Sequence, residues 1–192
     1  VLDHSVHVFL SGLGAEEFAI EQGLEEVDPS YFFTQKNYDR LKEVKVSTTM
    51  LTQEKLGTVG AVAIDKNGNL AAGTSTGGMT NKRYGRIGDV PVIGAGTYAE
   101  NGVCGISATG HGEFFIRNVV AHDIAARIKY ASHSIEKAAR EVISEMKEKG
   151  GAGGVIGLDS QGHVVMPFNT PGMFRGYISL DGSPVVAMYA ED

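Results

Sequence analysis

The chain has 192 residues and a formal net charge of −6, and 42 % of its residues are hydrophobic against 21 % charged. This is the composition of a globular domain, and its acidic balance argues against a nucleic-acid partner, which requires a basic surface. No apolar run approaches the roughly 20 residues of a membrane helix, so we expect no membrane partner and place the protein in the cytoplasm.

The first part of the chain, residues 1–57, is predicted to contain two helices and to end in a polar linker. The second helix begins after Thr34, a suitable N-cap, and Tyr38, Leu41 and Val44 form its apolar stripe. The linker has no hydrophobic period. In chain order, the predicted elements are a strand at residues 6–11, helices at 15–22 and 35–46, and the linker at 47–57.

The second part, residues 58–192, is predicted to contain two strand pairs, two helices and two further strand pairs. This order favours an α+β fold in which antiparallel sheets lie between helical layers. Cys104, the single cysteine, lies in a strand of small residues, and we interpret it as a core residue. The predicted elements are strands at residues 58–65, 70–76, 92–97 and 103–109, helices at 113–130 and 134–149, and strands at 154–158, 164–168, 174–178 and 185–189.

The Gly57–Thr58 junction is the first candidate functional position, because a polar linker ends there and a buried strand begins. A threonine hydroxyl is a weak nucleophile unless a base lies beside it, and an N-terminal threonine carries that base in its own α-amino group. Gly57 tolerates the geometry needed for the hydroxyl to attack the preceding carbonyl and cut the chain. Alternatively, Thr58 is only the first residue of a strand, where threonine is common.

A second threonine, Thr76, ends the strand that is expected to pair with the strand beginning at Thr58. If the Asn67–Gly68 turn forms a hairpin, Thr76 and Thr58 lie at the same end of the sheet and their hydroxyls come close. The surrounding Gly-Thr-Ser-Thr-Gly-Gly run is not a phosphate loop, because neither the lysine nor the helix of such a loop follows it. Alternatively, Thr58 and Thr76 are two unrelated turn residues.

Arg86 and Asp89 place a cation and an anion three residues apart in a glycine-rich loop. An arginine can donate two hydrogen bonds to a carboxylate, and an aspartate can accept hydrogen bonds from an ammonium group. Together they could hold the α-carboxylate and the α-amine of an amino acid. Alternatively, they form a local surface ion pair of little energetic value.

Thr109, Gly110 and Gly112 lie where a predicted strand meets a predicted helix. Backbone N–H groups at such a junction, together with the Thr109 hydroxyl, could stabilise a developing oxyanion, although an ordinary turn would have the same pattern. His111 has no nucleophile to pair with and is interpreted as neighbouring structure. The remaining histidines lack metal-ligand spacing, so we expect no metal and no cofactor.

Taken together, four segments of the chain resemble the plant-type asparaginase / isoaspartyl peptidase family of N-terminal-nucleophile hydrolases. The resemblance extends over residues 1–192 and is closest from Thr58 onward. Residues 58–192 are similar to the family's whole β subunit, and residues 1–57 to the later part of its α subunit, the two forming one domain. The family's opening strands and its sodium-binding loop are expected to be absent, so no structural sodium is expected either. The four segments are Gly57–Val62, Thr74–Gly78, Gly85–Asp89 and Thr109–Glu113.

The resemblance implies a role for each candidate residue. Thr58 would be the nucleophile, freed by autocatalytic cleavage of the Gly57–Thr58 bond, and Thr76 would hydrogen-bond its hydroxyl. Thr109 and Gly110 would form the oxyanion hole and contact the substrate. Arg86 would bind the substrate α-carboxylate, Asp89 would bind the α-amine, and Gly112 would line the amine pocket.

The same resemblance implies a four-layer αββα sandwich and a homodimer of processed αβ units. The substrate would be a small molecule or a dipeptide with a β-aspartyl amide bond. Two alternatives stay open. Glycosylasparaginases use the same kind of N-terminal nucleophile, but they carry an aspartate where this chain has Gly57. The chain could also be a non-catalytic fragment that is never processed.

Overall fold

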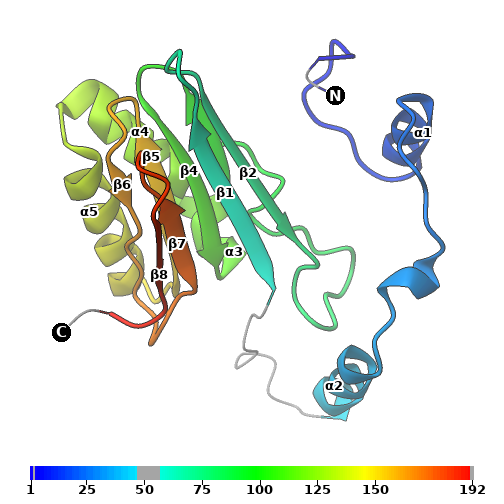
Figure 1. Ribbon diagram of the computed structural model, residues 1–192. Coiled ribbons are helices and arrows are strands. Elements are labelled where there is room, and N and C mark those ends of the chain that lie inside the picture. Colours follow the sequence, from blue (N-terminus) through cyan, green and yellow to red (C-terminus); the bar gives the residue numbers. More distant parts are fainter. Residues whose placement is uncertain (2, 47–56, 191–192) are drawn as a thin grey trace. The chain divides into compact units, whose positions relative to one another are not determined.

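The computed structural model describes residue 1 and residues 3–46 and 57–190, which form two units, Val1–Thr49 and Met50–Asp192 (Figure 1). The predicted linker at residues 47–57 falls, except for Gly57, outside the described residues. The subunit boundary at Gly57–Thr58 that the resemblance implies stays a prediction.

The first unit consists of short helices joined by extended chain. Its elements are α1 (Leu13–Glu21), the 3-10 helix η1 (Pro29–Phe32) and α2 (Gln35–Val46), in agreement with the two predicted helices. The strand predicted at residues 6–11 is wrong. Val6 and Val8 alternate with polar residues as in a strand, but they are 95 % and 63 % exposed, and no described segment pairs with them. Without a neighbouring strand, the backbone of this segment has no hydrogen-bond partner that would keep it extended.

The second unit begins with an antiparallel hairpin of β1 (Thr58–Ile64) and β2 (Leu70–Thr76). The turn between the strands is closed by the Asp65 carboxylate, which accepts hydrogen bonds from the backbone N–H groups of Asn67 and Asn69 at 2.8 Å each. Because this turn sets the register, the first residue of β1 pairs with the last residue of β2, Thr58 with Thr76. The hairpin predicted from the Asn67–Gly68 turn is therefore confirmed.

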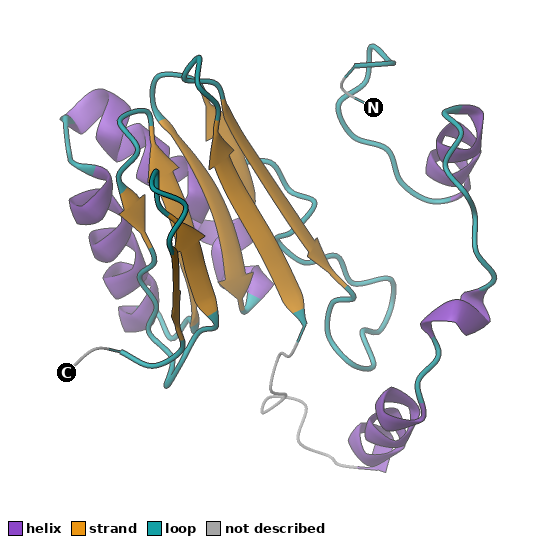
Figure 2. Ribbon diagram, viewed as in Figure 1, coloured by secondary structure: helices purple, strands orange, loops and turns teal. Residues whose placement is uncertain are grey.

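A four-stranded antiparallel sheet forms the middle of the second unit, in the order β3-β4-β5-β6. One face is covered by three helices and the other by the β1–β2 hairpin (Figures 1 and 2). Its strands are β3 (Thr97–Glu100), β4 (Cys104–Gly110), β5 (Gly153–Asp159) and β6 (Val164–Val165), and the helices are α3 (Gly112–Asn118), α4 (Val120–Ala131) and α5 (Ile135–Glu148).

The core lies between the helices and the four-stranded sheet. Cys104 is fully buried there, and burial raises the pKa of its thiol to about 12, so it is protonated near neutral pH. This agrees with its interpretation as a core residue. The largest fully buried side chains include Phe115, Ile106, Ile124 and Met146.

Small residues bring the two sheets together. A Cβ added to Gly60 of β1 would lie 2.1 Å from Ser107 Oγ on β4, and one added to Gly105 of β4 would lie 2.7 Å from Val62 Cγ1 on β1. The backbones therefore pack more closely than two ordinary side-chain layers would allow. This close packing places the ends of β1 and β4 side by side.

Three predicted elements of the second unit differ from the structure. The strand predicted at residues 164–168 is shorter, since β6 covers only Val164–Val165, and Phe168 forms an isolated bridge with Gly154. Residues 92–96 form a turn and not a strand, so β3 begins only at Thr97. The single helix predicted at residues 113–130 is two helices separated at Val119, which has a φ of 48°. The turn and the helix break come from one contact, since the backbone N–H groups of Ala121 and His122 at the start of α4 donate to the turn carbonyls of Ala95 and Gly94. A continuous helix would use those N–H groups internally.

A last antiparallel pair, β7 (Arg175–Ile178) and β8 (Pro184–Ala187), forms a separate two-stranded sheet and ends the described chain. The second unit is thus a mixed α and β structure with antiparallel sheets and helices, as the sequence predicts. None of the helices in the described segments is long and apolar enough to cross a membrane.

Candidate active site

Thr58 and Thr76 lie face to face at one end of the β1–β2 hairpin. The Thr58 hydroxyl donates to Thr76 Oγ1 at 3.3 Å, and the backbone N–H of Gly78 donates to the same Thr76 oxygen at 3.1 Å. Each hydroxyl is only partly buried, so the pair is held in place and still open to a reactant. The predicted closeness of the two hydroxyls is confirmed.

Gly57, directly before this pair, has a φ of 117°, which a residue with a side chain adopts only under strain. A Cβ added there would meet no atom within 4 Å. Glycine is therefore needed at this position for its backbone angle and not for space. The bond between Gly57 and Thr58 follows a backbone conformation that is uncommon for the other amino acids.

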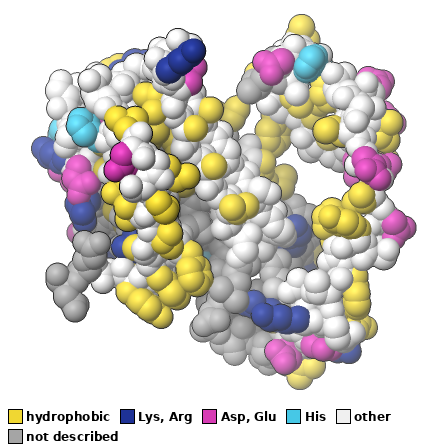
Figure 3. Space-filling view, in the orientation of Figure 1, with side chains coloured by type: hydrophobic (Ala, Val, Ile, Leu, Met, Phe, Trp, Pro, Cys, Tyr) yellow, Lys and Arg dark blue, Asp and Glu magenta, His cyan; other side chains and the backbone are white. Residues whose placement is uncertain are grey.

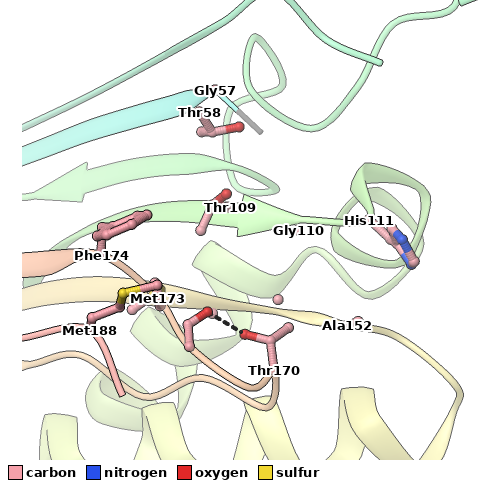
Figure 4. A pocket seen from close by; sticks show the side chains of 13 residues that line it. Gly57, Thr58, Thr109, Gly110, His111, Ala152, Thr170, Met173, Phe174 and Met188 are labelled. Carbon is pink, nitrogen blue, oxygen red and sulfur yellow. Dashed lines mark hydrogen bonds between the residues drawn. The ribbon is translucent and has the colours of Figure 1, made fainter. Parts of the chain in front are cut away.

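A pocket of about 450 Å³ opens beside Thr58 (Figure 4). Thr109 and Gly110 at the end of β4 form part of its wall, and in Figure 4 the Thr109 hydroxyl is directed toward the side of the pocket on which Thr58 lies. The hydroxyl-bearing residues Thr58 and Thr109 therefore border one space. The lining residues are Gly57, Thr58, Thr109, Gly110, His111, Ala152, Gly153, Gly154, Thr170, Gly172, Met173, Phe174 and Met188.

A second group of candidate residues lies at the start of α3. Arg86 donates two parallel hydrogen bonds to Glu113, from Nε to Oε1 and from Nη2 to Oε2, each at 2.8 Å. The bonds to Glu113 raise the pKa of Arg86, and those from Arg86 lower the pKa of Glu113. The guanidinium is thus held in one orientation by a carboxylate that the sequence analysis did not single out.

Asp89 is 1 % exposed, so the simple surface ion pair considered as an alternative is wrong. Gly112 lies against both charged residues. A Cβ added to it would be 2.6 Å from Asp89 Oδ1 and 2.8 Å from Arg86 Nη2. Arg86 and Asp89 therefore converge over a position that has room for no side chain, and a carboxylate and a guanidinium face the same small space.

The two groups of residues flank the turn between β4 and α3. Thr109 and Gly110 border the pocket on one side of this turn, whereas Gly112 contacts the Arg86–Asp89 pair on the other. His111 lies between them at the N-cap of α3, where its side chain makes no capping hydrogen bond. Its ring centroid lies 6.4 Å from that of Phe114, and it is one of the residues that line the pocket, so its interpretation as neighbouring structure stays a prediction.

The part of the chain that the structure describes contains no group of three or more histidine, cysteine, aspartate or glutamate residues that could hold a metal ion. The residues that sequence reasoning missed are Glu113 and the apolar wall of the pocket, made by Met173, Phe174 and Met188. The positive charge of Arg86 calls for a carboxylate partner, and this signal could have identified Glu113. The wall comes from segments more than 100 residues after Thr58 in the chain, and no local pattern marks it.

Comparisons with known proteins agree on one family. A family model described as "Asparaginase" matches residues 1–188. The chain is 46 % identical to a putative isoaspartyl peptidase/L-asparaginase of Dictyostelium discoideum, over 95 % of the chain and 63 % of that protein. It is 45 % identical to the isoaspartyl peptidase of Escherichia coli (strain K12), over 100 % of the chain and 63 % of that protein. A probable isoaspartyl peptidase/L-asparaginase 2 of Arabidopsis thaliana is 40 % identical, over 98 % and 66 % respectively. The chain thus spans slightly less than two thirds of the length of these curated relatives.

Proposed function

This chain belongs to the asparaginase family, and from that premise we propose that it hydrolyses β-aspartyl amide bonds, with Thr58 as the nucleophile. The substrates would be L-asparagine and isoaspartyl dipeptides. The observation that carries the proposal is the Thr58–Thr76 hydroxyl pair, which lies beside the pocket that Thr109 and Gly110 also line. A hydroxyl nucleophile and oxyanion donors are the two components that acyl transfer needs.

In the proposed maturation, the Thr58 hydroxyl attacks the Gly57 carbonyl, and the Gly57–Thr58 amide becomes an ester. Water then hydrolyses the ester, leaving a carboxylate on Gly57 and a free α-amine on Thr58. The uncommon backbone conformation of Gly57 supports this step, because a φ of 117° is one that glycine adopts without the strain it would impose on other residues at the scissile bond. The products would be a fragment ending at Gly57, of which residues 1–57 form the later part of the α subunit, and the β subunit, residues 58–192.

In the proposed reaction, the α-amine of mature Thr58 takes the proton from its own hydroxyl as the oxygen attacks the substrate side-chain carbonyl. The Thr109 hydroxyl and the Gly110 N–H stabilise the oxyanion that forms. The amine passes the proton to the leaving ammonia or amino acid, and an acyl ester remains on Thr58. Water then attacks this ester and releases aspartate. Apart from the substrate and water, every group in these proposed steps belongs to the chain, so the proposed steps require no metal or cofactor.

The substrate's own amino-acid end would be held at the start of α3. Arg86, oriented by Glu113, binds the α-carboxylate with its remaining guanidinium hydrogens, and the buried Asp89 accepts hydrogen bonds from the α-amine. Gly112 leaves the space that this amine needs. Arg86 and Asp89 together would select substrates that carry both a charged α-carboxylate and a charged α-amine.

Replacing Gly112 with alanine is expected to weaken substrate binding strongly. The new Cβ would lie 2.6 Å from Asp89 Oδ1 and displace it. Loss of a charged hydrogen bond costs about 1.5–3 kcal/mol, so KM should rise about 10- to 100-fold. Steady-state kinetics on β-aspartyl-leucine would measure the change. Gly73→Ala is the matched control, because a Cβ there would meet nothing within 4 Å. An unchanged KM in Gly112→Ala would contradict the assignment of the amine pocket.

The finer features of the family belong to the same proposal. We infer a four-layer αββα sandwich and a homodimer of processed αβ units. The layers described in the second unit, with helices on one face of a sheet and a second sheet on the other, support the sandwich. The cytoplasmic location expected from the sequence stays a prediction.

The decisive experiment is intact-mass spectrometry of the full-length protein, followed by turnover assays. We expect two fragments that join at Gly57–Thr58, ammonia release from L-asparagine, and hydrolysis of β-aspartyl dipeptides. Activity should fall below about pH 7.7–8.0, because the proposed base is an α-amine that must be neutral to accept a proton. A clear preference for N-acetylglucosaminyl-asparagine would favour a glycosylasparaginase, and an active but permanently uncut chain would contradict Thr58 as the nucleophile.

A further inference from the structure

Three hydroxyl groups, those of Thr74, Thr97 and Ser107, meet between the two sheets just behind the candidate active site. Thr74 Oγ1 lies 2.6 Å from Ser107 Oγ, and Thr97 donates to Thr74 Oγ1 at 2.5 Å. Ser107 is 3 % exposed, and the other two are partly buried. We call these three residues the hydroxyl cluster. The mechanism proposed above uses none of them.

The hydroxyl cluster joins the strand pair that carries the nucleophile to the sheet that carries the oxyanion donors. Thr74 lies on β2, two residues before Thr76 and on the same face, while Thr97 and Ser107 are cross-strand partners on β3 and β4. Directly opposite Thr74 on β1 is Gly60, whose missing Cβ leaves the space that Ser107 fills. At this position, the Ser107 side chain from one sheet thus occupies space that a side chain of the other sheet would need.

The same cluster contacts both ends of the loop that follows Asp89. The Thr97 hydroxyl lies 3.3 Å from the Val90 carbonyl, and the Thr74 hydroxyl lies 3.3 Å from the Gly96 carbonyl. The Gly96 N–H in turn donates to the Asp89 carbonyl at 3.1 Å. A Cβ added to Gly96 would lie 2.9 Å from Asp89 Oδ2, so Gly96 packs directly against the carboxylate. The position of Asp89 is therefore coupled to Thr74 through Gly96.

We propose that the Thr74–Thr97–Ser107 hydroxyl cluster is a positioning element that sets Asp89 relative to Thr58, and so determines the selectivity for substrates with an α-amine. This inference rests on the proposed function. Thr74 is its central member, because it alone reaches from the nucleophile's hairpin to the Asp89 loop. Its loss frees Gly96 from that hairpin and lets Asp89 move away from the amine, whereas Arg86 keeps its bonds to Glu113.

The test compares inhibition of β-aspartyl-leucine hydrolysis by L-aspartate with inhibition by succinate, which has both carboxylates but no amine. In Thr74→Val, the inhibition constant of L-aspartate should rise about 3- to 10-fold, the value of one hydrogen bond, while that of succinate changes less than about twofold. Thr74→Ser should restore the wild-type ratio of the two inhibition constants, that of L-aspartate to that of succinate. Ser75→Ala, on the opposite and exposed face of β2, is the matched control and should change neither constant.

A general loss of structure would weaken both inhibitors together, so an unchanged ratio in Thr74→Val would overturn the inference. Ser107→Ala removes the hydroxyl that β4 contributes to the cluster, and it must shift the ratio of inhibition constants in the same direction. It provides a second variant if Thr74→Val folds poorly. In the Asp89→Asn background, Thr74→Val should have little further effect on L-aspartate. A wild-type protein that hydrolyses no β-aspartyl substrate would overturn the proposed function and this inference with it, whereas active wild type with an unchanged ratio overturns the inference alone.

Discussion

Replacing Thr58 with alanine is expected to abolish both cleavage of the chain and hydrolysis of β-aspartyl amides. Both reactions are proposed to begin with attack by the same hydroxyl, which the structure places 3.3 Å from Thr76 Oγ1. Removal of a covalent nucleophile lowers kcat by about 10⁴-fold or more. Intact-mass spectrometry would measure the first effect, and ammonia release would measure the second.

The conservative variant Thr58→Ser separates chemistry from structure. It keeps a hydroxyl at the end of β1 and should retain measurable cleavage and turnover, although without the methyl group the oxygen is less firmly oriented. Thr58→Ala should unfold at nearly the wild-type temperature, since its side chain is only partly buried. An alanine variant that is still cut after Gly57, or that still releases ammonia at the wild-type rate, would rule out Thr58 as the nucleophile.

The β1–β2 hairpin could be predicted from sequence because its determinants are local. An aspartate followed by an Asn-Gly turn closes on itself, as the bonds from the Asp65 carboxylate demonstrate. Once the turn is set, strand pairing leaves one register, and that register brings Thr58 beside Thr76. The first half of the candidate site therefore follows from residues 58–76 alone.

The chain between residues 92 and 122 could not be predicted in the same way, because its conformation depends on contacts between distant segments. A helical period runs through Val119, and only the bonds from Ala121 and His122 to the turn at residues 94–95 explain why the helix breaks there. The same turn occupies residues 92–96 of the strand predicted at residues 92–97. The break is functionally relevant, since this turn continues into Gly96, which packs against Asp89.

The arrangement of charges around Arg86 was predictable only in part. The spacing of Arg86 and Asp89 suggests a binding pair, but it does not distinguish an exposed ion pair from a buried one. Burial of Asp89 and the two bonds from Arg86 to Glu113 come from the folded loop. Glu113 also gives the pair a pH dependence. Its lowered pKa means that its stabilising interaction is present above the ordinary glutamate pKa and is lost as the pH falls through the lowered value.

The second large effect is expected for Thr109→Val, which should lower kcat by about 10²- to 10³-fold, the cost of one oxyanion-hole donor. Valine has nearly the same shape as threonine, so the wall of the pocket is retained and only the hydroxyl is lost. Because the oxyanion forms only during the reaction, KM should change little. Steady-state kinetics on β-aspartyl-leucine would measure both constants.

The contrast between two variants makes this prediction specific. Thr109 borders the pocket beside Thr58, whereas Gly112, three residues later, contacts Arg86 and Asp89. Thr109→Val should therefore lower kcat at nearly constant KM, and Gly112→Ala should raise KM more than it lowers kcat. Thr109→Ser restores the donor and should recover most of the lost kcat. If Thr109→Val instead raises KM at unchanged kcat, Thr109 binds the ground state of the substrate, and the oxyanion hole must be sought elsewhere.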